Sequence, residues 1–230
     1  FPPYPDRNDV DLHAILHPAK EVGGDLYDFY MDGNHLYFLI GDVSGKGVPA
    51  SLFMAITRSL FRTLSQHVLS PAKIVTEMNN SISDNNESNM FVTLIVGILD
   101  LETGILKLCN AGHNPPILIY PDGQVSYLEF KTQIFVGVVE DFKYSDEEVV
   151  LEKESKLFLY TDGVTEAENI NKELYGEEKL LEMLSDNASS DVRTTVNVVV
   201  DSIASHVKEA EASDDLTILL IQYEPGTANS

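Results

Sequence analysis

The sequence predicts an α+β fold, a layered sandwich in which helices cover the outer faces of antiparallel sheets. Two apolar and aromatic runs flank the turn Asp32-Gly33-Asn34, which is typical of a β-hairpin. Five consecutive strand-like segments occupy the middle of the chain, and turn signals separate them. A doubly wound parallel fold needs strands and helices in strict alternation, so these five strands argue against it.

Hydrophobic periodicity and turn residues predict the individual elements. The predicted strands cover residues 10–16, 26–31, 35–41, 91–99, 105–109, 117–120, 125–129, 149–151, 156–161 and 216–223. The predicted helices cover residues 48–67, 71–82, 176–184 and 191–208, with Ser70 as the N-cap of the second. The core-facing side of the first helix is expected to be the stripe Leu52, Ile56, Leu60 and Leu64.

A chain of 230 residues suits one domain with a sizeable core. We expect this domain at residues 10–223, between the end of a linker at 1–9 and a disordered tail at 224–230. Because the chain opens on Phe1 rather than Met, it is expected to be a piece of a longer protein. Tyr27, Phe29 and Cys109 are expected in the core.

The composition excludes several classes of partner. With 37 acidic and 15 basic residues the formal net charge is −22, which repels nucleic acid and anionic membranes and weakly favours a basic partner. A single cysteine rules out a disulfide framework and fits a reducing compartment, so we expect a cytoplasmic domain. No apolar run reaches the roughly 18–20 residues of a membrane span. Segments outside the domain could still tether the protein to a membrane.

The hairpin places two carboxylates close together. If Gly33-Asn34 is a two-residue loop, Asp25 lies directly opposite Asp42; if Asp32-Gly33 is the loop, the two are diagonal neighbours on one face. Either register separates them by roughly 5–8 Å. Like charges at this distance are destabilising, and a divalent cation between them would explain the arrangement.

A second acidic group lies at two later strand ends. Asp162 ends one apolar strand, and Asp214-Asp215 begin another, so the groups meet if these strands are antiparallel neighbours. Two such pairs at one rim would suit hard cations such as Mg²⁺ or Mn²⁺. Zinc is not expected, because no His/Cys set with ligand spacing exists. The alternative is that these aspartates are ordinary turn and cap residues.

Five motifs in succession resemble those of the bacterial PPM-type (protein phosphatase 2C-like) serine phosphatases, in the branch of stage II sporulation protein E and the RsbU-type sigma-factor regulators. The resemblance covers about residues 11 to 222. Its motifs are Glu21-Val-Gly-Gly-Asp25-Leu-Tyr-Asp28, Gly41-Asp42-Val-Ser-Gly-Lys-Gly-Val-Pro-Ala50, Ala111-Gly-His-Asn-Pro115, Tyr160-Thr-Asp162-Gly163-Val-Thr-Glu166 and Asp214-Asp215-Leu-Thr217.

The resemblance implies a four-layer αββα sandwich with a dinuclear metal site at one end. It implies that Asp25 and Asp42 hold two Mn²⁺ or Mg²⁺ ions, that Asp42 bridges them and that the Val43 carbonyl adds a ligand. Asp162 and Asp214 would complete the first ion's sphere. Asp215 would be a ligand or a neighbour of the ligands.

The chemistry that follows is hydrolysis of phosphoserine or phosphothreonine by a hydroxide that bridges the metals. This reaction needs no protein nucleophile. Animal and plant relatives carry a His after the bridging Asp-Gly that is absent here, so the general acid is unassigned. Lys46 and His113 are candidate substrate contacts, against a solvated turn for Lys46 and a structural turn for His113.

The leading interpretation is therefore the phosphatase output domain of a bacterial signalling protein. The resemblance implies an upstream sensor module and a phosphorylated STAS-type anti-sigma-factor antagonist as substrate, and a homodimer is retained as an open alternative. The rival interpretation is a catalytically weak or inactive docking domain of the same fold. A phosphoacceptor receiver domain is disfavoured because it needs alternating strands and helices.

Overall fold

The protein, described here by a computed structural model for residues 3–84, 86 and 89–225, contains two antiparallel sheets packed face to face. One sheet has the order β2-β3-β4-β5-β8 and comprises β2 (Leu26–Asp32), β3 (His35–Val43), β4 (Val92–Asp100), β5 (Ile105–Ala111) and β8 (Glu147–Val150). The other has the order β1-β10-β9-β6-β7 and comprises β1 (Val10–His17), β10 (Leu216–Tyr223), β9 (Lys156–Tyr160), β6 (Ile117–Ile119) and β7 (Val125–Tyr127).

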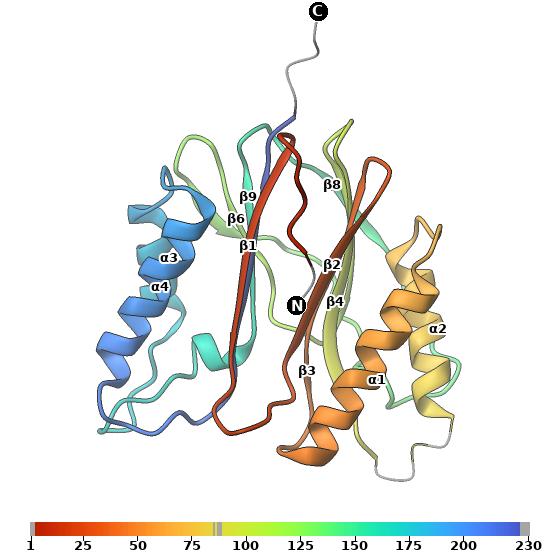
Figure 1. The fold of residues 1–230 in the computed structure, drawn as a ribbon, viewed down its shortest axis with the longest axis horizontal. Helices are drawn as coiled ribbons and strands as arrows, with labels where there is room; N and C mark the ends of the chain where they lie inside the picture. The colour runs from red at the N-terminus through yellow and green to blue at the C-terminus, as the bar shows by residue number, and fades with distance from the viewer. Residues whose placement is uncertain (1–2, 85, 87–88, 226–230) are drawn as a thin grey trace, which may run out of the picture.

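Helices cover the outer face of each sheet, as Figure 1 shows. The sheet that begins with β2 packs against α1 (Val48–Leu64) and α2 (Pro71–Ser83). The sheet that begins with β1 packs against α4 (Val192–Val207), beside which α3 (Glu177–Asp186) lies. A 3-10 turn, η1 (Asp162–Val164), follows β9. The predicted four-layer αββα order is thereby confirmed.

Three apolar layers hold the sandwich together. Side chains such as Phe29, Phe38 and Leu159 fill the space between the sheets. The layers under the helices include Phe61 of α1 and Val199 of α4. The central strands β3, β4, β9 and β10 are buried on both faces, which explains their nearly continuous apolar sequences. Tyr27, Phe29 and Cys109 are buried as predicted.

The predicted core stripe of α1 is wrong in its first half. Leu52 and Ile56 are 62% and 55% exposed, whereas Ala50, Thr57 and Phe61 are buried. Relative to the prediction, the helix is rotated about its axis, so its buried face contains residues 50, 57 and 61. These residues form a neighbouring stripe that also has helical periodicity. Two apolar stripes compete along this sequence, and periodicity alone cannot choose between them.

The register of the β2–β3 hairpin agrees with the first of the two predicted alternatives. Asp32 pairs with His35, so the loop is Gly33-Asn34, and the last registered pair is Leu26 with Gly41. One residue further, Asp25 stands opposite Asp42. The second predicted pairing also holds: β9 and β10 are antiparallel neighbours, and Thr161 N donates to Thr217 O at 3.1 Å.

The end of α1 and the predicted linker differ from the sequence-based prediction. α1 stops at Leu64 rather than continuing to His67, because His67 adopts a φ of 60°, which a helix does not accommodate. Part of the predicted linker packs on the domain: the Tyr4 hydroxyl bonds to the backbone of Ala14, and its ring contacts Phe29. The predicted tail lies outside the described residues from 226 onward.

Candidate active site

Four strand ends bring carboxylates to one rim of the sandwich. Asp25 precedes β2, Asp42 lies near the end of β3, Asp162 follows β9, and Asp214 with Asp215 precedes β10. This acidic rim is at the lower end of the molecule in Figure 1, near the start of α1 and the turn η1. The rim combines residues from both sheets, so it exists only when the sandwich is assembled.

Asp25 is the most enclosed of these acids, with 2% of its surface exposed. Its Oδ2 accepts hydrogen bonds from the hydroxyls of Thr217 at 2.6 Å and Thr161 at 2.7 Å. Burial raises its pKa to about 9, the charges of Asp42 and Asp215 add to the rise, and the two hydroxyls oppose it. Without a nearby cation the fold therefore favours a protonated carboxyl here.

Burial and neighbouring negative charges also disfavour the ionised forms of Asp42 and Asp162. Burial, followed by the charges of Asp162 and Asp214, raises the pKa of Asp42 to about 7. Burial and the charge of Asp214 raise the pKa of Asp162. These acids therefore lie close enough to resist joint ionisation, which is the arrangement that a bound cation would relieve.

Asp214 has a protein cation beside it. The Lys46 ammonium donates to Asp214 Oδ2 at 2.9 Å and to the Ser213 carbonyl at 2.7 Å. The hydrogen bond to Asp214 raises the pKa of Lys46. Both side chains are about half exposed, so the ion pair is solvated and can open at low cost. Neither predicted role of Lys46, substrate contact or solvated turn residue, included this contact.

Asp215 holds the connection between β1 and β2. Its Oδ1 accepts from Ala19 N at 2.8 Å, and its Oδ2 accepts from Gly24 N at 2.8 Å and Asp25 N at 3.4 Å. A Cβ built on Gly23 would lie 1.9 Å from Asp215 Oδ2, so only glycine fits there. Since both oxygens already accept amide hydrogens, metal ligation by Asp215 stays a prediction.

The other two predicted site residues occupy different environments. A Cβ built on Gly24 would lie 2.9 Å from the Val43 carbonyl oxygen, so this oxygen lies at the rim beside the glycine. His113 is only 4% exposed, and its Nδ1 lies 3.0 Å from Thr93 Oγ1. Burial lowers its pKa to about 4. This placement favours the structural interpretation of His113 over a substrate contact.

Sequence reasoning missed three residues of the rim: Thr161, Thr217 and Glu166. The two threonines adjoin the acidic motifs in the sequence, but threonine is common in strands, so adjacency gave no usable signal. Glu166 follows Asp162 by four residues, and its N–H donates to the Asp162 carbonyl at 2.8 Å. Burial, then the charges of Asp162 and Asp214, raises the pKa of Glu166.

Asp28, in the same motif as Asp25, faces the other side of its sheet. It is fully buried and accepts hydrogen bonds from Arg58 at 3.1 Å and from Arg62 at 2.6 Å. The arginines are four residues apart on α1, so they present one face to the carboxylate. This ion-pair group fastens α1 to β2, and the i,i+4 spacing of the arginines was its only sequence signal.

The donor set of the rim fits hard divalent cations, because all of its candidate ligands are oxygen atoms. The raised pKa values of Asp25 and Asp42 point the same way. Within the described residues, however, no three His, Cys, Asp or Glu side chains converge as one ion's ligands. Asp214 is directed to Lys46 instead. The donor chemistry fits the ions, and the ligand set stays a prediction.

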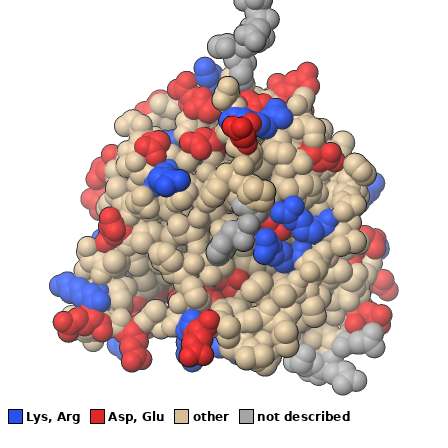
Figure 2. Space-filling model, viewed as in Figure 1, with Lys and Arg blue, Asp and Glu red and all other residues tan. Residues whose placement is uncertain are grey.

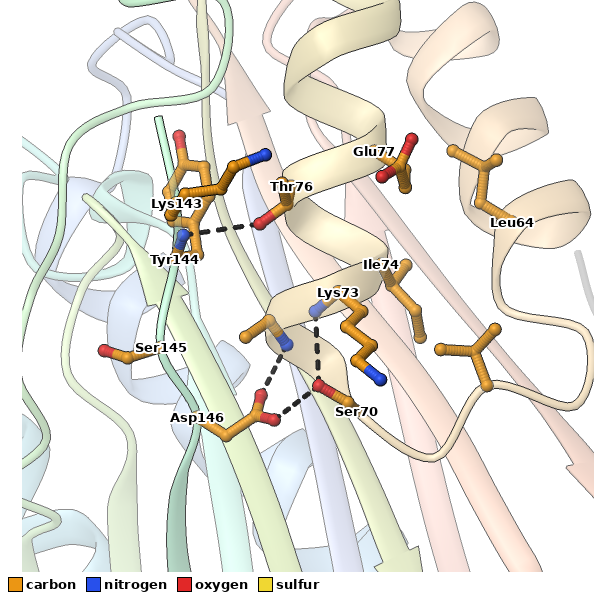
Figure 3. A pocket seen from close by; sticks show the side chains of 12 residues that line it. Leu64, Ser70, Lys73, Ile74, Thr76, Glu77, Lys143, Tyr144, Ser145 and Asp146 are labelled. Carbon is orange, nitrogen blue, oxygen red and sulfur yellow. Dashed lines mark hydrogen bonds between the residues drawn. The ribbon is translucent and has the colours of Figure 1, made fainter. Parts of the chain in front are cut away.

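A separate cavity of about 650 Å³ lies away from the rim, between the α1–α2 connection and residues 143–146. Figure 3 shows that Asp146 points to the start of α2, where it accepts from the Ser70 hydroxyl at 2.6 Å and from the Ala72 amide. These bonds, together with the predicted Ser70 cap on Lys73 N at 3.2 Å, satisfy the helix terminus. The cavity contains none of the predicted site residues.

Comparison of the fold identifies the class of protein. The SiaA-PP2C domain of Pseudomonas aeruginosa superposes with a TM-score of 0.83 at 22% identity, covering 93% of this chain and 86% of that chain. A structure of RsbX in complex with magnesium gives a TM-score of 0.73 at 18% identity, covering 96% and 99% of the chains. The sandwich is therefore a protein phosphatase 2C fold.

The chain belongs to the stage II sporulation protein E (SpoIIE) family, whose model matches residues 32–224. This confirms the family that the five motifs predicted. The chain is 27% identical over 95% of its length to the phosphoserine phosphatase RsbU of Bacillus subtilis, and 27% identical over 94% to protein IcfG of Synechocystis. It spans 64% of RsbU and 38% of IcfG.

Proposed function

We propose that this domain is a metal-dependent protein phosphatase that hydrolyses phosphoserine or phosphothreonine. The observation that carries the proposal is the acidic rim, where carboxylates from both sheets meet and where burial, together with their mutual charge, raises their pKa values. The name of RsbU, a phosphoserine phosphatase, supports the same reaction.

In this proposal the rim binds two Mn²⁺ or Mg²⁺ ions through Asp25, Asp42, the Val43 carbonyl, Asp162 and Asp214. Such ions activate water and neutralise charge on the transferring phosphoryl group. Asp215 keeps the β1–β2 connection against the rim through its backbone bonds. Cys109 is fully buried, so it does not supply a nucleophile. The chain's own contribution is to hold the carboxylates in place.

We further propose that the substrate is a phosphorylated STAS-type antagonist of an anti-sigma factor, and that an upstream sensor module regulates the domain. The name of RsbU, a phosphoserine phosphatase of which this chain spans 64%, supports the phosphoserine part of this assignment. Within the part of the chain that the structure describes, no helix is long and apolar enough to cross a membrane. We place the domain in the cytoplasm, with a homodimer as one assembly to test.

One observation favours a second candidate, a catalytically weak docking domain of the same fold. Lys46 holds Asp214, and three ligands do not converge on a point among the described residues. In this alternative the rim binds metal poorly, and the domain acts by contact with a partner.

Hydrolysis of p-nitrophenyl phosphate in MnCl₂ separates the two candidates. The phosphatase proposal predicts turnover that EDTA abolishes and that Asp162→Asn reduces at least a hundredfold. Glu140→Gln, a change in an exposed loop far from the acidic motifs in sequence, is the matched control and should retain full activity. Turnover that persists in EDTA, or no turnover in MnCl₂, would contradict the proposal. A phosphoserine peptide assayed in parallel tests the substrate class.

A further inference from the structure

Two threonine hydroxyls converge on one oxygen of Asp25. Thr161 follows β9 and Thr217 lies in β10, while Asp25 enters β2 in the opposite sheet. Both threonines are fully buried, and their Oγ1 atoms lie 2.7 and 2.6 Å from Asp25 Oδ2. A buried hydroxyl needs a partner, and each of these finds it across the interface between the sheets.

The donor directions are set by a third hydrogen bond. Thr217 N donates to Thr161 Oγ1 at 3.1 Å. The Thr161 hydroxyl therefore accepts from the backbone and has its own proton free for Asp25 Oδ2. The chain of bonds runs from Thr217 N through Thr161 to the carboxylate. Because the two threonines lie on adjacent antiparallel strands, the backbone fixes the Thr161 hydroxyl as a donor to Asp25.

The two bonds have a consequence for the remaining oxygen of Asp25. Oδ2 accepts from two hydroxyls and also lies in a buried setting, so it has little room for a further partner. The backbone N–H of Asp25 donates to Asp215 at 3.4 Å, which restrains the main chain at the same point. The two hydroxyl bonds restrict the side-chain torsions of Asp25, and Oδ1 is the oxygen that no threonine hydroxyl engages. In the metal-free protein the Asp25 carboxyl also hydrogen-bonds to the Asp42 side chain, a contact that a cation between the two carboxylates would replace.

We propose that Thr161 and Thr217 are positioning residues that lock the Asp25 carboxylate across the two sheets and present Oδ1 to a divalent cation. The inference rests on the proposed function, because it concerns the same rim. Outer groups that orient a metal ligand in this way typically change metal affinity 10- to 100-fold when removed. Neither threonine touches the ion or the substrate in this role.

The test compares Thr217→Val, which keeps the shape and removes the hydroxyl, with Thr217→Ser, which keeps the hydroxyl. Mn²⁺ affinity is measured by titration calorimetry and by the electron paramagnetic resonance signal of free Mn²⁺. We expect Thr217→Val to weaken Mn²⁺ binding about tenfold, and Thr217→Ser to bind within about threefold of the wild type. Saturating Mn²⁺ should restore most of the lost turnover in Thr217→Val.

Thr195→Val is the matched control. Thr195 is also a fully buried threonine, but its hydroxyl donates to the Asp191 carbonyl at 2.9 Å in α4, away from the rim. This variant should bind Mn²⁺ as the wild type does. If Thr217→Val fails to fold by circular dichroism, Thr217→Ala replaces it, again compared with Thr217→Ser.

The outcomes separate this inference from the function on which it rests. Unchanged Mn²⁺ affinity in folded Thr217→Val, with a wild type that binds and hydrolyses, overturns the positioning role alone. Equal weakening in Thr217→Ser overturns it too, because a lost hydroxyl would then not be the cause. A wild type that does not bind Mn²⁺ overturns both.

Discussion

Asp42 is a residue at which the fold and the proposed chemistry oppose each other, because the fold favours its protonated form and metal binding needs its carboxylate. In the folded protein, burial and the charges of Asp162 and Asp214 raise the pKa of Asp42 from its ordinary value of 3.8 to about 7. A raised pKa means that the folded state holds a proton which the unfolded chain has released. In the metal-free protein, stability is therefore highest in mild acid and falls as pH rises from about 4 through 7.

Asp42→Asn removes the destabilisation caused by ionising Asp42, and it also removes the proposed bridging ligand of the metal ions. In EDTA at pH 8 we expect the free energy of unfolding to rise by about 1–3 kcal/mol, and the loss of stability between pH 5 and 8 to become shallower than in the wild type. Turnover with Mn²⁺ should vanish. Urea unfolding at several pH values measures the first effect. A variant as unstable at pH 8 as the wild type would contradict the assigned repulsion.

The sequence predicted some of these residues and not others, for a physical reason. Asp25 and Asp42 could be paired because a two-residue hairpin loop fixes which residues face each other across the strands. Thr161 and Thr217 could not be assigned to Asp25, because that contact depends on how the two sheets approach each other. Lys46 was unassignable for the same reason, since its partner Asp214 is 168 positions away.

At the scale of elements, α1 shows the limit of periodicity. Its sequence carries two overlapping apolar stripes, and the sheet selects the one containing Ala50 and Phe61, whereas Leu52 and Ile56 remain exposed. The selection agrees with the ion pairs of Arg58 and Arg62 to Asp28, which set the rotation of the helix on β2. The strands and the αββα layering were predictable, because alternation and turn residues are local properties.

This rotation of α1 predicts which substitutions the helix tolerates. Replacing Leu52 and Ile56 together with serine should change the free energy of unfolding by less than about 0.5 kcal/mol per site, since little apolar contact is lost. Phe61→Ala should cost about 3–5 kcal/mol, because it opens a cavity under the helix. Guanidinium unfolding measures both. If the double serine variant were as unstable as Phe61→Ala, this result would contradict the rotation of α1 described above.

At the scale of the whole molecule, the acidic rim and the acidic surface act on stability together. The formal net charge is −22, and the face shown in Figure 2 carries more acidic than basic side chains. Charge of one sign opposes the compact state throughout the molecule, and salt screens it. The rim adds a local, partly buried repulsion that salt screens far less. Divalent cations should therefore stabilise the protein in two distinguishable ways.

We expect Mn²⁺ at about 100 times its dissociation constant to stabilise the fold by about 2.7 kcal/mol, which raises the melting temperature by roughly 5–10 °C. NaCl at the same ionic strength reports screening alone and should give a smaller shift. The double variant Asp25→Asn/Asp42→Asn should respond to MnCl₂ and NaCl equally, because only surface screening remains. Differential scanning calorimetry with EDTA-treated protein measures each shift. Equal shifts for MnCl₂ and NaCl in the wild type would show that the rim binds no ion, and the two sheets would then meet at this end without a shared ligand.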